Sequence, residues 1–230
     1  MAYAFIAQTG FANGSGGGTS SAIDTTGANL IVIVAARLEG SAPTISDSAS
    51  NTWSALTVRN SGNSAAVRIY YVFAPTTSAT HTFTSSGANT YGSLSILAFS
   101  GSVTSPFDAE NGAGATTGTS RATGSVTPAE DNELFIAGIA FGVEVTGLAI
   151  DSTFIGLNHY IAGGTSIDVG SAYKIQTTGG AENPTFSWTT SSDNAAAIAC
   201  FKAGAAGRTT KNTRGFTLGT EIGMNWRSGL

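Results

Sequence analysis

The side chains best suited to acid–base or nucleophilic chemistry are few in this 230-residue chain. Its two histidines, His81 and His159, have no Asp or Glu close to them in the sequence, and no Gly-x-Ser-x-Gly nucleophile elbow occurs. A catalytic site needs an acid, a base and a nucleophile that converge. The sequence therefore favours surface or turn histidines and predicts that the protein is not an enzyme.

Two short segments carry several side-chain oxygen atoms each. Glu130, Asp131 and Glu133 precede an apolar run, and a solvated turn at the entry to a strand explains them better than a glycosidase pair, which must flank a sugar. The segment 47–51 (DSASN) offers oxygen atoms at alternating positions, but it lacks the glycine and the distal glutamate of a calcium loop. Asp and Asn also favour turns, so we predict a turn here and expect no metal and no cofactor.

Cys200 and Trp53 each allow two interpretations. Cys200 is the only cysteine, which excludes an internal disulfide, and its apolar neighbours indicate a buried small side chain. Trp53 follows a polar loop, so it could contact a glycan by stacking or pack at the rim of the core. Trp188 alternates with Phe186 and is predicted to lie in the core.

Charge is scarce and unevenly distributed. Charged residues make up 10% of the chain, well below the level typical of soluble domains. Residues 1–204 hold 6 basic and 13 acidic residues, a net charge of −7, whereas residues 205–230 hold 4 basic and 1 acidic residue, a net charge of +3. An acidic body argues against nucleic-acid binding. The longest apolar run, 30–36, is too short to span a membrane, and no signal peptide is recognisable, so we expect a soluble protein.

The chain repeats itself at an offset of 102–105 residues. Five segments recur in order, and the apolar run Leu30–Ala36 matches Leu134–Ala140. The other matches pair 45–48 with 150–152, 67–73 with 169–175, 82–84 with 185–187, and 94–101 with 197–204. Ordered matches at a nearly constant offset indicate an internal duplication.

Each repeat has the pattern of β-strands. Apolar and polar residues alternate through 67–73, as in a half-buried strand, whereas Leu30–Ala36 is continuously apolar, as in a strand covered on both faces. Turn clusters separate these runs, and no segment shows a helical period. We predict an all-β protein with two tandem or pseudo-twofold β-sandwich repeats, immunoglobulin-like or jelly-roll-like, at 1–101 and 102–204.

The sequence resembles β-sandwich modules of tailed-phage virion proteins and of some bacterial surface proteins. The residues that carry this resemblance are 45–47 (ISD), 51–53 (NTW), 69–71 (IYY), 80–84 (THTFT) and 97–101 (LAFSG). The resemblance implies a non-catalytic virion structural protein, such as a capsid decoration, head-fibre or tail-associated protein, assembled in the host cytoplasm. Its partners would be other copies of itself and other virion proteins. The alternative is a lectin-like adhesion module that binds surface glycans.

Residues 205–230 form a C-terminal arm that has no counterpart in the first repeat. The arm is too polar and too short to bury a core of its own, yet its apolar residues lie at even positions, the period of an extended strand. We expect it to add as a strand to a neighbouring subunit or to the particle surface. The residues expected to mediate assembly are Arg208, Lys211, Arg214, Phe216, Leu218, Ile222, Met224 and Trp226.

Overall fold

The computed structural model describes residues 2–13, 16–41, 43–87, 91–151, 153–162 and 167–204. Within these ranges the regular structure is all strand, joined in antiparallel sheets, so the prediction of an all-β protein is confirmed. Since none of these residues belongs to a helix, this part of the chain contains no candidate for a helical membrane span. The predicted assembly arm, 205–230, lies outside the described residues.

Residues 2–101, the first half, form two sheets. Their strands are β1 (Ala4–Phe11), β2 (Gly18–Thr19), β3 (Leu30–Leu38), β4 (Thr44–Asp47), β5 (Ser54–Ala55), β6 (Arg59–Asn60), β7 (Ala65–Phe73), β8 (Phe83–Ser86) and β9 (Ser93–Ser100). The larger sheet has the order β1-β9-β3-β7-β5, with β6 also paired to β7. The smaller sheet has the order β2-β8-β4.

Residues 102–204, the second half, also form two sheets. Their strands are β10 (Ser102–Ala115), β11 (Ser120–Ala122), β12 (Leu134–Phe141), β13 (Ala149–Ile150), β14 (Ile155–Tyr160), β15 (Asp168–Ile175), β16 (Thr185–Ser187) and β17 (Asn194–Ala203). The larger sheet has the order β10-β17-β12-β15-β14, and the smaller has the order β11-β16-β13. Apart from β6, which pairs with β7 beside β5, this is the strand order found in the first half.

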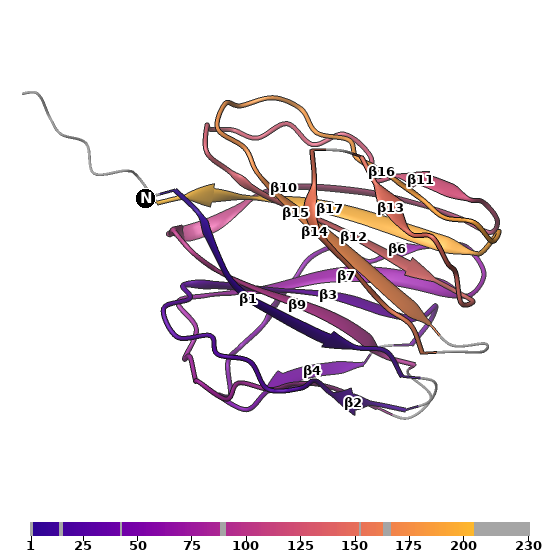
Figure 1. Ribbon diagram of the computed structural model, residues 1–230, viewed down its shortest axis with the longest axis horizontal. Coiled ribbons are helices and arrows are strands. Elements are labelled where there is room, and N and C mark those ends of the chain that lie inside the picture. Colours follow the sequence, from indigo (N-terminus) through magenta and orange to yellow (C-terminus); the bar gives the residue numbers. More distant parts are fainter. Residues whose placement is uncertain are drawn as a thin grey trace, which may run out of the picture.

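The four sheets stack as four layers, with the two large sheets in the middle and one small sheet on each outer side (Figure 1). Three apolar clusters fill the spaces between the layers. One joins the large sheet of the first half to its small sheet, and another does the same in the second half. The third and largest lies between the two large sheets.

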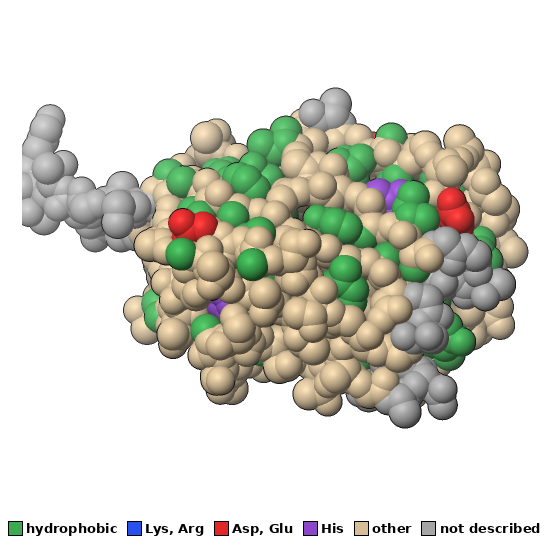
Figure 2. Space-filling model, turned by 60° about the horizontal axis from the view of Figure 1, so that its bottom comes forward, with side chains coloured by type: hydrophobic (Ala, Val, Ile, Leu, Met, Phe, Trp, Pro, Cys, Tyr) green, Lys and Arg blue, Asp and Glu red, His purple; other side chains and the backbone are tan. Residues whose placement is uncertain are grey.

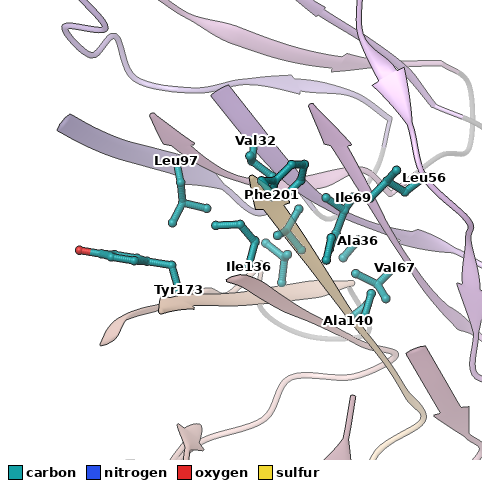
Figure 3. Packing of buried hydrophobic residues seen from close by; sticks show 14 of the residues in the cluster. Val32, Ala36, Leu56, Val67, Ile69, Leu97, Ile136, Ala140, Tyr173 and Phe201 are labelled. Carbon is teal, nitrogen blue, oxygen red and sulfur yellow. The ribbon is translucent and has the colours of Figure 1, made fainter. Parts of the chain in front are cut away.

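This central cluster explains the continuous apolar runs of the sequence. Val32 and Leu97 from the first half point toward Ile136 and Phe201 from the second half (Figure 3). The alternate residues of the same strands belong to the two outer clusters. Every residue of β12 is buried, because the strand is covered on both faces. Burial of apolar surface on two sides of the large sheets is the main stabilising contribution to the fold.

The strand registers show how closely the halves correspond. In each half the edge strand shifts register by one residue directly after a phenylalanine, Phe5 in β1 and Phe107 in β10, and both pair with a phenylalanine of the neighbouring strand. The sequence match of Ile45 with Ile150 is wrong. Ile150 pairs with Phe186, whereas the residue that pairs with Phe83 in the first half is Asp47. The sequence match there is displaced by two residues.

The halves differ where they meet most closely. Val34 in β3 and Gly138 in β12 hold the same place in their sheets, and they face each other across the central cluster. A Cβ atom on Gly138 would collide with the side chain of Val34. The small residue on one side therefore lets the two large sheets approach around the larger residue on the other side.

Polar contacts also join the halves. The Glu110 carboxylate accepts hydrogen bonds from the backbone N–H and the hydroxyl of Thr57, the latter at 2.7 Å. Within the central layer the hydroxyls of Ser95 and Ser171 hydrogen bond at 2.7 Å. The Tyr3 hydroxyl donates to the Lys202 carbonyl at 2.8 Å. The two halves therefore share both an apolar core and a hydrogen-bonded rim.

Candidate functional site

A groove of about 440 Å³ lies at the boundary between the halves. Its walls come from β5 and the end of β7 in the first half and from the beginning of β10 in the second half. The lining residues are Thr52, Ser54, Tyr71, Val72, Phe73, Thr104, Ser105, Pro106 and Phe107.

A wide bulge in β10 creates this groove. Ser102 pairs with Ala203, but the next pair is Phe107 with Phe201, so four residues of β10 stand opposite one residue of β17. The segment 103–106 therefore leaves the ladder and forms one wall, and Pro106 within it has no N–H to offer a partner strand. Bulges of this kind redirect side chains and are common next to binding sites.

The groove has an uncharged, aromatic and hydroxyl-rich lining. The rings of Tyr71 and Phe107 stack with their centroids 6.2 Å apart and their planes at 18°. Exposed hydroxyl groups come from Thr52, Ser54 and Thr104, and none of the lining residues is charged. Aromatic faces with nearby hydroxyls suit a neutral, polar ligand with apolar faces, such as a sugar.

Trp53, for which the sequence allowed either a glycan contact or packing at the rim of the core, lies beside this groove but points elsewhere. Its indole N–H donates to the Asp47 carboxylate at 2.9 Å, and its ring packs edge-on against Phe83 at 6.2 Å. The ring is only partly exposed, at the rim of the outer core of the first half. Its neighbours Thr52 and Ser54 line the groove instead.

His81 is not a surface histidine, and that expectation is wrong. The side chain is fully buried, with Nε2 3.3 Å from Asp47 Oδ1 and Nδ1 2.9 Å from the Thr25 hydroxyl. Thr25 Oγ1 also accepts from the Ser78 N–H and lies 3.2 Å from its carbonyl. The group has the composition of a Thr-His-Asp triad, but a buried hydroxyl shared among three contacts is not presented to a substrate.

His159 is also paired with an aspartate. Its Nε2 lies 3.6 Å from Asp168 Oδ2, and only 14% of its side chain is exposed. The other carboxylate oxygen of Asp168 accepts a hydrogen bond from the Ala162 N–H at 3.0 Å. The His159 ring meets Phe141 edge-on at 5.8 Å, so the pair closes one end of the outer core of the second half.

The segment 47–51 forms the predicted turn. Asp47 Oδ1 accepts hydrogen bonds from the N–H groups of Ala49 at 2.8 Å and Asn51 at 3.2 Å. With Trp53 on its other oxygen and His81 beside it, this carboxylate organises the turn internally. The turn prediction is confirmed, and the contacts explain the Asp and Asn without calcium.

The acidic group before β12 divides into two parts. Glu130 and Asp131 are exposed, as a solvated turn requires, but Glu133 is fully buried, so the prediction is wrong for that residue. Asp108 and Cys200 supply the other potential ligand atoms, and the three atoms all lie within 4.8 Å of one another. Among the described residues this is the group whose atoms could hold a metal ion.

The environment of this group favours the protonated forms of Glu133 and Cys200. Burial, more than the nearby Asp108 charge, raises the pKa of Glu133 above its usual value, and burial raises the pKa of the Cys200 thiol. The Ala129 N–H and the Lys202 ammonium, 3.0 Å from Asp108 Oδ1, lower the pKa of Asp108 by more than its partial burial raises it. The prediction that Cys200 is buried is confirmed.

Comparison of the chain with protein-family models, with curated proteins and with solved structures finds no match. The groove and the buried group were both missed by sequence reasoning. The groove depends on a bulge and on the contact between halves, and the buried group joins residues 92 positions apart. The eight arm residues expected to mediate assembly, from Arg208 to Trp226, lie outside the described residues.

Proposed function

We propose that this protein is a non-catalytic structural protein of the kind found in tailed-phage particles, and that it assembles with its own copies or with other particle proteins through residues 205–230. The observation that supports the proposal best is that the last described residues of the body are held in its large sheet. β17 runs to Ala203 along the edge strand β10, and the Gly204 N–H bonds to the Gly101 carbonyl. The arm therefore starts from a fixed point on the body.

The surface charge and the titratable side chains of the body fit a structural role. In the view of Figure 2, acidic side chains form only small separate spots among polar and hydrophobic ones. Neither histidine presents an accessible reacting group, and most of the described carboxylates take part in hydrogen bonds or ion pairs. A stable, weakly charged body with an apolar-patterned arm fits assembly better than catalysis.

We also infer that the body consists of two repeats of one sandwich module, 1–101 and 102–204. Support comes from the matching strand order of the halves and from the register shifts after Phe5 and Phe107. Each module would be a large sheet covered by a small one, and the two modules would be joined back to back through the large sheets.

The test of assembly keeps the chain complete and changes one face of the arm. Replacing Phe216, Leu218 and Trp226 with Ser removes three of the five apolar residues expected to mediate assembly and leaves the body unchanged. The control replaces the intervening Thr217 and Asn225 with Ser. We expect the first variant to lose its oligomer or its association with particles in analytical ultracentrifugation and co-sedimentation, and the control to keep them. Normal assembly of the first variant would refute the proposal.

A second candidate function, glycan binding, is favoured by the lining of the groove. A Ser105→Trp substitution would fill the groove from its exposed wall, and Ser125→Trp, at another exposed position, is the matched control. If the groove binds sugars, an immobilised-glycan screen should give saturable binding that Ser105→Trp abolishes and Ser125→Trp retains. Binding that survives Ser105→Trp would exclude this groove.

A further inference from the structure

The buried group formed by Asp108, Glu133 and Cys200 joins three neighbouring strands of the second half, β10, β12 and β17. Asp108 is the extra residue of the register shift after Phe107, Glu133 immediately precedes β12, and Cys200 lies in β17. Cys200 Sγ is 3.8 Å from Asp108 Oδ2 and 3.7 Å from the Ala109 carbonyl oxygen. The backbone of the two central strands fixes the positions of Glu133 and Cys200.

The same place in the first half is built differently. The strand registers define the equivalent positions in the two halves. A backbone hydrogen bond found in both halves agrees with them: the Ala74 N–H donates to the Asn29 carbonyl, and the Gln176 N–H donates to the Glu133 carbonyl. Those positions hold Ile6, Asn29 and Ala98. The fold therefore needs neither a carboxylate nor a thiol at this place, and the second half has three metal-ligating side chains where the first has none.

The carboxylate of Glu133 provides an independent indication of a ligand. Its side chain is fully buried, and Oε1 accepts a hydrogen bond from the Glu130 N–H at 3.1 Å. Within the described residues no donor meets hydrogen-bond geometry at Oε2, which is out of contact with water and has Asp108 and Cys200 beside it. An unsatisfied buried carboxylate oxygen is costly, and it is rare unless something else binds it.

We propose that Asp108, Glu133 and Cys200 bind a divalent transition-metal cation with the ligand preferences of Zn²⁺. A tetrahedral zinc ion places a thiolate sulfur and a carboxylate oxygen about 3.5 Å apart, close to the 3.8 Å between Cys200 and Asp108. A thiolate ligand favours zinc-like ions over Ca²⁺ and Mg²⁺, which prefer oxygen ligands.

Charge and access agree with this assignment. A bound cation would displace the protons that Glu133 and Cys200 favour, and these protons would pass to solvent. The resulting two carboxylates and one thiolate carry three negative charges, which the divalent cation and the nearby Lys202 ammonium neutralise together. The Lys202 side chain is 30% exposed and that of Asp108 is 10% exposed, so solvent reaches the group from this side. Lys202 would turn away from Asp108 to admit the ion and remain as a neighbouring countercharge.

The experiment uses the full-length protein and Co²⁺ alone as the probe, because Co²⁺ reports thiolate ligation and tetrahedral geometry by absorption. We expect one equivalent of Co²⁺ to bind, with a sulfur-to-cobalt charge-transfer band and intense visible bands, and Zn²⁺ to displace it. Failure to bind, or binding without the charge-transfer band, would overturn the proposal.

Variants locate the ion. Cys200→Ala reproduces the Ala98 of the first half and should abolish the charge-transfer band, and Glu133→Gln should weaken binding by more than about tenfold. The double variant Glu130→Gln/Asp131→Asn removes two exposed carboxylates of the same turn and should bind as the wild type does. Co²⁺ spectra unchanged in Cys200→Ala would mean a surface ion and would refute the site. If Cys200→Ala fails to fold, Cys200→Ser provides the same comparison.

Discussion

Single residues hold loops of this protein in place through buried polar contacts, and Asp47 is the clearest example. Its carboxylate receives two backbone N–H groups and the Trp53 indole N–H, and it lies beside the buried His81. We expect Asp47→Ala to lower the free energy of unfolding by about 3–5 kcal/mol, because several buried donors lose their acceptor at once. Urea denaturation measures the change.

Asp24 provides the control for this prediction. It is exposed, and its side chain accepts a hydrogen bond from the Thr26 N–H two residues away. Asp24→Ala should change stability little. A loss in Asp47→Ala no greater than that in the control would show that the network contributes no stability beyond an ordinary turn.

Sequence reasoning at this scale succeeds where neighbours along the chain decide the environment. The apolar residues around Cys200 were enough to predict its burial. The pairing of His81 with Asp47 was not predictable, because it spans 34 residues and depends on the register that sets Asp47 opposite Phe83. Glu133 looked solvated because its neighbours are, but its backbone already enters the ladder with Gln176.

At the scale of strands, the contact between β3 and β12 depends on the unequal pair Val34 and Gly138. We expect Gly138→Val to destabilise the protein by about 2–4 kcal/mol, since the added methyl groups force the large sheets apart. The exchange Val34→Gly/Gly138→Val should recover part of this loss, because it restores one large and one small residue. Thermal and urea unfolding of the two single variants and the double variant measure the coupling energy.

An additive double variant would count against this contact. If the losses in Val34→Gly and Gly138→Val simply sum, the two residues do not share a packing site, and the close approach of the sheets has another cause.

The strands themselves were largely predictable, and their lateral arrangement was not. Alternation at 67–73 and the continuous run at 30–36 match β7 and β3, because burial on one face or two leaves a direct trace in the pattern. The bulge at 103–106 leaves no such trace, since it depends on how β10 meets β17. The groove therefore became visible only with the sheet register.

For the molecule as a whole, the central cluster makes each half dependent on the other. Residues 1–101 alone would expose the inner face of the first large sheet, including Val32 and Leu97. We expect each half, produced alone, to aggregate or self-associate, and the two halves produced together to form a soluble one-to-one complex.

Calorimetry of the intact protein extends this test. Because the largest core is shared, unfolding should be a single cooperative transition. Two well-separated transitions, or a monomeric and stable isolated half, would contradict the shared core.

The pairing of Val34 with Gly138 has a consequence for how the two halves can change by mutation. Two identical chains joined face to face must carry the same side chain at both of these positions, because one codon specifies both. A single chain that contains both halves has a separate codon for each, so one position can become large while the other becomes small. A single chain can therefore differ on one side of this contact alone, just as the second half has Asp108, Glu133 and Cys200 where the first half has Ile6, Asn29 and Ala98.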